Sequence, residues 1–191
     1  MKPSAFAAVG SLLVSMVIAG CGAEDADAGD GDVGETGETT EALTASCKLS
    51  RAQILAATSG DRRAAIARGF EWYDDRVPYS QTRSHEGYQT DCSGFISMCW
   101  KTGTSYTTAS FVAGTTSSSL SSYNSLEPAD ALVYRTGSHG HIVLFLGWND
   151  SAHTSACVLE QASTASDMQF RARSTASLRA SGFRAIRADR F

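Results

Sequence analysis

Apolar residues are spaced in two different ways along the chain, and the change comes at Pro128. Before this residue, apolar positions recur every three or four residues in residues 61–75 and after Cys92, which is typical of helices. After it, short apolar runs alternate with turn residues, which is typical of strands. The runs are residues 131–134, 142–146, 156–159, 168–172 and 183–186. Helices followed by closely connected strands predict an α+β domain with an antiparallel meander.

Two helices are predicted at the start of this domain. Ser50 and Gln53 have the spacing of a capping box before a short helix that Gly60 would end. A second helix is predicted over residues 61–75, with Ile66, Gly69 or Phe70, and Tyr73 on its apolar face.

Pro78 then stops the helical pattern. The polar segments 79–91 and 102–125 show no strong periodicity and are predicted to be loops.

The first 20 residues have the pattern of a signal peptide. Lys2 precedes an apolar stretch over residues 5–19, which is shorter than the roughly 20 apolar residues of a membrane-spanning helix. The run Ile-Ala-Gly-Cys ending at Cys21 resembles a bacterial lipoprotein signal, in which Cys21 becomes the lipidated first residue of the mature chain. This resemblance implies a lipid anchor in the cell envelope, in the outer membrane because Gly22 follows the cysteine. Cleavage of an ordinary secretory signal near Cys21 is the alternative.

An acidic linker is predicted over residues 21–45. It contains eight acidic residues and no basic one, and scattered glycines interrupt it, so it cannot bury a core. An acidic interaction tail or a calcium-binding stretch is the alternative, although the Gly-Asp alternation is too short and irregular for a calcium loop. Residues 46–191 have the size of one domain.

The charge of this domain differs from that of the whole chain. Residues 46–191 contain 15 basic and 12 acidic residues, whereas the whole chain has a net charge of -4. Six arginines lie near the end of the chain: Arg171, Arg173, Arg179, Arg184, Arg187 and Arg190. Few aromatic residues accompany them, so a nucleic-acid partner is not predicted. We expect solvated strand faces or attraction to anionic envelope polymers.

The run Asp-Cys-Ser-Gly-Phe at residues 91–95 carries the strongest chemical signal. Helical spacing begins directly after Cys92, which places this cysteine at a helix N-terminus. There the helix dipole favours the thiolate, and the backbone N–H of Cys92 or Ser93 can stabilise an oxyanion. The alternative is that Cys92 is a buried small residue on an apolar stripe. Polar neighbours on both sides favour the nucleophile.

With this run, the chain resembles the NlpC family of cell-wall cysteine peptidases. Three further segments occur in the family's order: Val-Pro-Tyr-Ser at residues 77–80, Leu-Glu-Pro-Ala-Asp-Ala-Leu at 126–132, and Gly-His-Ile-Val-Leu-Phe-Leu-Gly at 140–147. The resemblance covers residues 77–161. It implies a papain-like arrangement, in which the nucleophile's helix packs on a small antiparallel sheet. The family's Pro-Gly-Asp turn reads Pro128-Ala129-Asp130 here, and alanine accepts positive φ less readily than glycine.

Four histidines compete for the role of general base: His85, His139, His141 and His153. His141 opens an apolar strand and matches the family's histidine, so we predict that it is the base for Cys92. A strand-end histidine bonded to a turn is the alternative. His139 and His153 are expected in turns facing solvent, and His85 in the loop before the nucleophile.

The base needs a partner that fixes its orientation. The family supplies it from the next strand, where Glu160 and Gln161 lie on opposite faces by alternation. Glu160 is our preferred partner, and Gln161 is the alternative if the motif is aligned on Ala162-Ser163. The resemblance also implies that Tyr79 lies near the nucleophile and helps to bind the scissile carbonyl.

Three other cysteines remain: Cys47, Cys99 and Cys157. Export permits a disulfide, and we hypothesise a bond between Cys47 and Cys157, with Cys99 on a buried helix face. No closely spaced cysteine pair or His-Glu-x-x-His run occurs, so neither a metal nor a cofactor is predicted.

These residues together predict an exported, monomeric cysteine hydrolase. Cys92 would form a thioester that water resolves, with His141 as the base. The resemblance implies that the substrate is a peptidoglycan stem peptide, cleaved at an amide bond next to a D-isoglutamyl unit. Two alternatives remain: a cysteine-dependent amidase or acyltransferase with another substrate, and a non-enzymatic envelope-binding lipoprotein.

Overall fold

The computed structural model describes residues 46–191. The predicted signal peptide, the acidic linker and the lipidation site Cys21 lie outside these residues. The helices are α1 (Arg51–Ala56), α2 (Gly60–Asp74), α3 (Cys92–Trp100), α4 (Thr108–Val112), the 3-10 helix η1 (Tyr123–Ser125) and α5 (Thr175–Ala180). The strands are β1 (Ser80–His85), β2 (Tyr88–Thr90), β3 (Ser117–Ser119), β4 (Ala131–Thr136), β5 (His139–Trp148), β6 (Ser155–Gln161), β7 (Met168–Ser174) and β8 (Arg184–Ala188).

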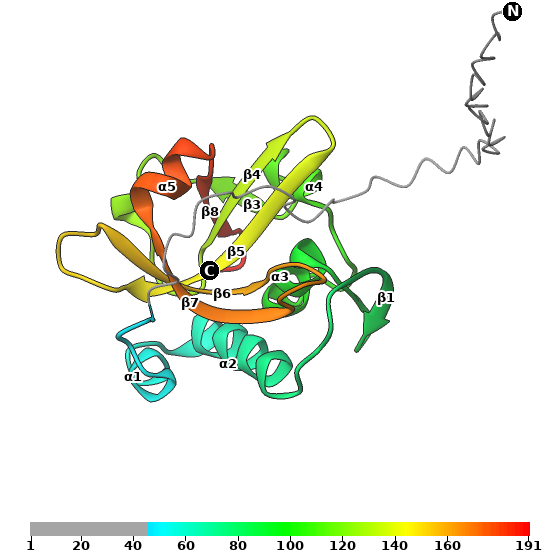
Figure 1. Cartoon of the computed structure of the whole chain (residues 1–191), viewed down its shortest axis with the longest axis horizontal. Helices are drawn as coiled ribbons and strands as arrows, with labels where there is room; N and C mark the ends of the chain where they lie inside the picture. The colour runs from blue at the N-terminus through cyan, green and yellow to red at the C-terminus, as the bar shows by residue number, and fades with distance from the viewer. Residues whose placement is uncertain (1–45) are drawn as a thin grey trace, which may run out of the picture.

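The domain therefore mixes helices with antiparallel sheets, as predicted. The main sheet has the order β3-β8-β4-β5-β6-β7. Strands β4 to β7 form the expected meander, but β8 does not extend it. After α5 the chain returns to the other edge of the meander, where β8 pairs with β4 (Figure 1).

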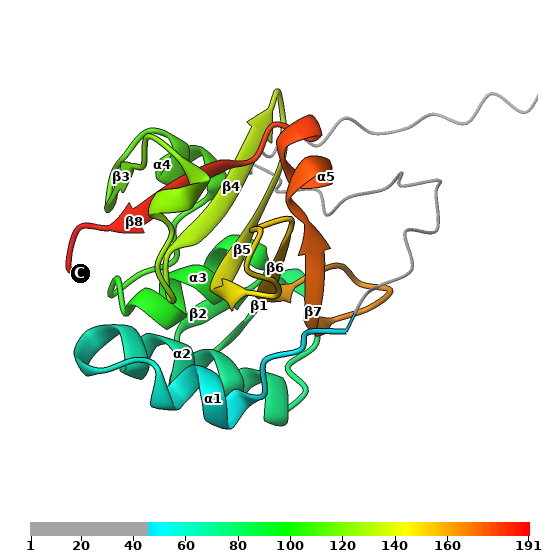
Figure 2. The ribbon, with the colours of Figure 1, turned by 90° about the vertical axis from the view of Figure 1, so that its left-hand side faces the viewer.

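Each face of the sheet is covered, which explains the continuous apolar runs of its central strands. On one face, Ile142, Leu144 and Leu159 join the core formed with α2 and α3. On the opposite face, a second core contains Val143, Phe145, Val158, Leu178 of α5 and Phe183, among others. Figure 2 shows α1 and α2 packed below the sheet and α5 beside β7.

The two predicted N-terminal helices are present, with different boundaries. The capping box of Ser50 and Gln53 is confirmed, but α1 ends at Ala56, and Gly60 begins α2 with a φ of 55°. On α2, Tyr73 is 37% exposed, whereas Trp72 is fully buried. Trp72 Nε1 donates to Glu86 Oε2 at 3.0 Å, and this bond satisfies the buried indole.

Segment 79–91 is a β-hairpin, so the predicted loop is wrong here. Glu86 and Gly87 connect β1 and β2, and both have positive φ, 52° and 85°. Two successive positive φ values are typical of a type I′ hairpin turn. Because these strands carry polar residues on both faces, the hydrophobic pattern did not predict them. Segment 102–125 likewise contains α4, β3 and η1.

Ala129 has a positive φ of 76° in the turn before β4. Asp130 N donates to Glu127 O at 2.9 Å, which closes the turn. The turn is held from outside as well, because Trp100 Nε1 donates to Ala129 O at 2.9 Å. Arg62 donates to the buried carboxylate of Asp130 at 2.9 Å. These contacts compensate the strain of an L-residue in this conformation.

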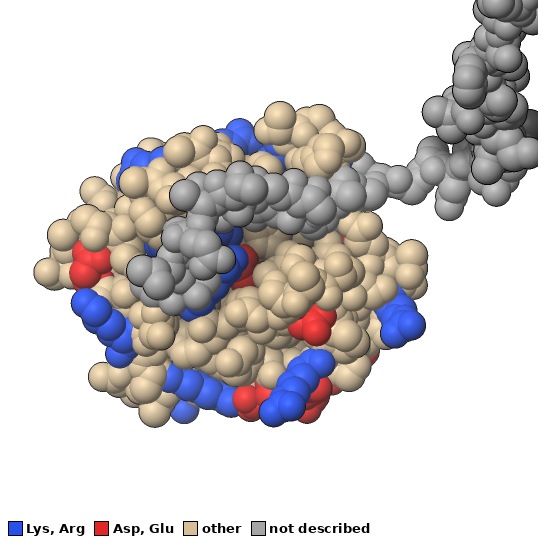
Figure 3. Space-filling model, in the orientation of Figure 1, with Lys and Arg blue, Asp and Glu red and all other residues tan. Residues whose placement is uncertain are grey.

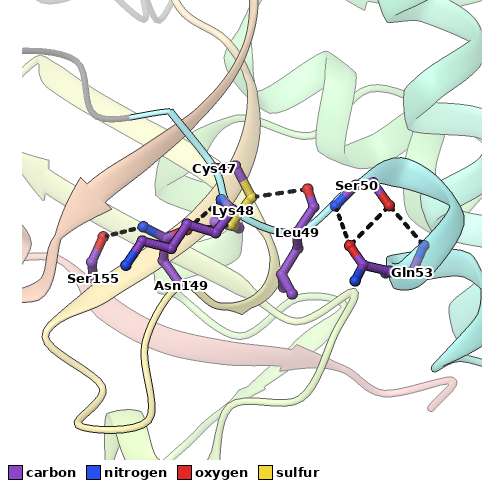
Figure 4. Close-up of a disulfide and its surroundings, with 8 residues drawn as sticks. Cys47, Lys48, Leu49, Ser50, Gln53, Asn149 and Ser155 are labelled. Atoms are coloured by element: carbon purple, nitrogen blue, oxygen red, sulfur yellow. Dashed lines mark hydrogen bonds between the residues drawn. A yellow bond between two sulfur atoms is a disulfide. The ribbon is translucent and has the colours of Figure 1, made fainter.

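The Cys47–Cys157 disulfide is confirmed, with a Cα–Cα distance of 5.3 Å (Figure 4). It ties the start of the domain to β6, and beside it Lys48 N donates to Asn149 Oδ1 at 2.6 Å. Cys99 is fully buried outside any disulfide, and burial raises the pKa of its thiol. Cys99 is therefore a core residue.

The late arginines do not form one basic surface. Arg171 and Arg173 contact Glu160, Arg187 contacts Asp130, and Arg190 contacts Asp61. On the face shown in Figure 3, basic and acidic side chains are scattered among other residues. The prediction of solvated strand faces is therefore wrong for the arginines paired with buried carboxylates. Among residues 46–191, no helix has the length and apolar character needed to cross a membrane.

Candidate functional site

Cys92 is the first residue of α3, as predicted. Asp91 is the N-cap residue, and its Oδ1 accepts from Gly94 N at 2.6 Å. Ser93 Oγ donates to the same oxygen at 3.2 Å. Cys92 is fully buried and forms no disulfide. The site combines a thiol with the positive end of a helix dipole, the environment that favours a thiolate.

Close packing fixes the start of α3 against β2. A Cβ added to Gly94 would lie 2.0 Å from the backbone oxygen of Gln89. Only glycine permits this approach. The hairpin that precedes the cysteine is therefore positioned directly by the first turn of its helix.

His141 is fixed from the following strand. Its Nε2 lies 2.7 Å from Glu160 Oε2, and both side chains are almost completely buried. Gln161 is directed elsewhere, and its Nε2 donates to Val77 O at 2.9 Å. Of the two candidates for the third position, Glu160 is thus the one that contacts His141.

Two arginines complete the surroundings of Glu160. Arg171 Nε donates to Oε1 at 2.7 Å, and Arg173 Nη1 lies 3.4 Å from Oε2. Burial alone would raise the pKa of Glu160. The hydrogen bond with His141 and the charges of Arg173 and Arg171 outweigh burial and hold this pKa well below its ordinary value. Glu160 is therefore a carboxylate at neutral pH.

The imidazole of His141 has one nitrogen left for chemistry. Its Nδ1 is buried and has no hydrogen-bond partner within residues 46–191. The ring packs edge-on against Phe183, with centroids 6.3 Å apart. Its neighbour Ile142 belongs to the core that contains α3. The structure thus brings His141 to Glu160 and directs one ring nitrogen to the carboxylate.

Ser93 is the second residue of α3, and Tyr79 lies in the segment that leads to the hairpin before it. Tyr79 is buried, and its backbone N donates to Asp167 Oδ1 at 2.8 Å. It directly precedes β1, the first strand of the hairpin that leads to Cys92. The Ser93 hydroxyl is used by Asp91, so its backbone N–H is the group suited to an oxyanion.

The remaining histidines have separate surroundings. His139 is exposed at the start of β5. His153 lies in the turn predicted for it, is half-buried, and stacks on Trp148 with centroids 4.1 Å apart. His85 packs edge-on against Trp72 at 5.4 Å. Among the described residues, no group of three or more His, Cys, Asp or Glu side chains is arranged to hold a metal ion.

Arg171 and Arg173 are the site residues that the sequence pattern missed. They alternate along β7, and the pairing of β7 with β6 puts Val158 opposite Arg171 and Ala156 opposite Arg173. Glu160 lies on the same face as Val158 and Ala156 by alternation. A buried glutamate next to a strand with two alternating arginines is therefore the signal that could have identified them.

No family model matches the chain, and no curated protein matches it.

Proposed function

We propose that this protein is an exported cysteine hydrolase with a papain-like arrangement, anchored in the envelope through Cys21. Its substrate is an amide bond in a peptidoglycan stem peptide, next to a D-isoglutamyl unit. The observation that carries the proposal is the position of Cys92 at the first residue of α3, behind the Asp91 cap. The buried pair of His141 and Glu160 supports it, because an imidazole held by a carboxylate is suited to act as a base.

In the proposed reaction, His141 Nδ1 takes the proton from Cys92 Sγ, and the sulfur attacks the substrate carbonyl. The backbone N–H of Cys92 or Ser93 stabilises the resulting oxyanion, with Tyr79 beside it. His141 then returns its proton to the leaving amine, and a thioester remains on Cys92. Water, deprotonated by His141, releases the acid and regenerates the thiol. Glu160 keeps Nε2 protonated and stabilises the imidazolium throughout.

This sequence of steps requires Nδ1 to reach the sulfur. Catalytic hydrogen bonds are often long or misaligned without substrate and tighten in the complex. We propose that His141 Nδ1 forms its catalytic hydrogen bond in the substrate complex.

The decisive experiment is digestion of purified muropeptides, with products identified by mass spectrometry. Cys92→Ala should abolish cleavage with little change in melting temperature, and His141→Ala should reduce it by at least about a hundredfold. Cys99→Ala is the matched control, since it removes a buried thiol that has no role in the reaction. Full cleavage by the Cys92→Ala protein would refute the proposal.

A second candidate is a non-enzymatic envelope-binding lipoprotein. The complete burial of Cys92 favours it. Iodoacetamide distinguishes the two, because a catalytic thiolate reacts quickly at neutral pH and a buried thiol does not. A slow reaction together with saturable binding to isolated cell wall would establish the binding protein. A reactive Cys92 on a protein that leaves muropeptides intact would instead indicate an amidase or acyltransferase with another substrate.

A further inference from the structure

The hairpin before the nucleophile has a free edge. Strands β1 and β2 form a two-stranded sheet separate from the main sheet, and among the described strands β1 pairs only with β2. Figure 1 shows β1 at the right-hand edge of the molecule. The outer edge of a strand offers backbone N–H and C=O groups to an added peptide strand.

Strand β1 is irregular where it passes Gln81. Ser80 pairs with Thr90 and Ser84 with Gln89, so the register shifts between Ser80 and Ser84. Within the irregular segment, the Ser80 hydroxyl accepts from the backbone N of residues 82 and 83, at 3.2 and 3.1 Å. A bulge of this kind redirects side chains, and bulges are common next to active sites.

The carboxamide of Gln81 has an unused donor. Its Nε2 is shielded from water and has no hydrogen-bond partner within residues 46–191. The backbone of Gln81 is fixed, because Gln89 Nε2 donates to Gln81 O at 3.1 Å. A shielded donor without a partner is costly, and a ligand that supplies the acceptor would remove this cost.

Short contacts connect Gln81 to the start of α3. Gln89, which holds Gln81 O, presents its own backbone oxygen to Gly94 in the first turn of α3. Thr90 Oγ1 donates to Ser80 O at 3.3 Å and joins the base of the hairpin. Cys92 follows Thr90 by two residues. The unused donor therefore lies on the element that the nucleophile's helix positions.

We propose that the substrate peptide lies extended along the outer edge of β1 and that one of its carbonyl groups accepts a hydrogen bond from Gln81 Nε2. Gln81 is then a positioning residue that sets the substrate's register relative to Cys92. This inference rests on the proposed function and names the part of the fold that binds the peptide.

The test compares two substitutions with wild-type protein on a synthetic stem peptide containing the γ-D-Glu linkage. Gln81→Met keeps the side-chain length without a donor, and Gln81→Glu supplies acceptors only. Both should lower kcat/KM about tenfold or more, mainly through KM. Alkylation of Cys92 by iodoacetamide should stay within twofold, because this reagent does not use the peptide site.

Thermal unfolding distinguishes positioning from a structural role. Gln81→Met removes a donor without a partner and should not lower the melting temperature. Gln169→Met is the matched control on β7, where Nε2 donates to Met168 O at 3.0 Å; it should lower the melting temperature and leave kcat/KM unchanged. Cleavage by Gln81→Met within twofold of wild type, or an equal loss of alkylation and cleavage, would overturn the inference.

A binding measurement can test the role of Gln81 independently of the proposed catalytic function. Affinity for the intact peptide can be measured by calorimetry on the Cys92→Ala protein, with and without Gln81→Met. About tenfold weaker binding in the double variant supports the role of Gln81 even if the wild-type protein releases no product. Equal binding by the two proteins contradicts it whether or not Cys92 is catalytic.

Discussion

At the scale of single residues, Gly94 is the position least tolerant of change. Gly94→Ala would put a methyl group 2.0 Å from the Gln89 backbone oxygen, and neither helix nor hairpin backbone moves easily. We expect a loss of about 3 kcal/mol in the free energy of unfolding, the upper range for overpacking. Chemical denaturation measures it. Gly103→Ala is the control for positive φ without a clash, and equal losses in both variants would contradict the packing argument.

Glu160 should contribute to stability as well as to the site. Glu160→Gln removes the charge that compensates Arg173 and Arg171, so we expect a loss of about 3 kcal/mol at neutral pH. The exposed Glu127 also pairs with two arginines, and Glu127→Gln should cost less than about 0.5 kcal/mol. Urea denaturation of both variants would show whether burial makes the difference.

The lowered pKa of Glu160 also makes the stability lost in Glu160→Gln depend on pH. The unfolded chain takes up a proton near the ordinary pKa of 4.5, while the folded protein does not. The unfolded state is therefore favoured as the pH falls below this value. The difference in stability between wild type and Glu160→Gln should shrink between pH 5 and pH 3, on the order of 1 kcal/mol per pH unit. A constant difference would mean that Glu160 stabilises without its charge.

The chemistry of individual residues was predictable only where local sequence decides it. Asp91 and Cys92 were predictable because the helix spacing after them fixes the cap. The choice of Glu160 over Gln161 depends on two arginines from the next strand, which no local pattern connects to it. The orientation of His141 depends on strand pleat and on packing against Phe183, so it also required the structure.

At the scale of elements, the β1–β2 hairpin depends on its turn. Gly87 has a φ of 85° and no atom within 4 Å of an added Cβ, so Gly87→Ala costs backbone energy alone. We expect a loss of about 1 kcal/mol, because an L-residue is disfavoured in this region. Gly87→Asn should lose less, since asparagine tolerates positive φ. Thermal melts of the two variants test the order, and a reversed order would contradict the assigned turn.

The strands after Pro128 were predictable because short apolar runs separated by turn residues are typical of strands and of few other structures. The β1–β2 hairpin was not, because Ser80 to His85 carries polar residues on both faces and its turn reads Glu-Gly rather than Asn-Gly. The position of β8 was also hidden. Strand β8 pairs with β4 because the chain passes through α5 and returns to the other edge of the meander. This long-range connection cannot be predicted from apolar runs.

At the scale of the whole molecule, the Cys47–Cys157 disulfide closes a loop of 110 residues. The loss of chain entropy in the unfolded state predicts about 5 kcal/mol of stabilisation. Cys47→Ser with Cys157→Ser should therefore lower the denaturation midpoint strongly, and reductant should do the same to wild type. Wild-type protein whose denaturation midpoint does not change with reductant would exclude a structural role for this bond.

The same bond determines how a mechanical pull enters the domain. Cys47 lies next to the first described residue and is bonded to the middle of the main sheet's β6. Tension from the preceding chain would pass through sulfur into β6 before it reaches α1. Force applied from the N-terminal side should therefore leave α1 and α2 folded until the strands of the main sheet separate. After reduction, the same force would peel α1 away first.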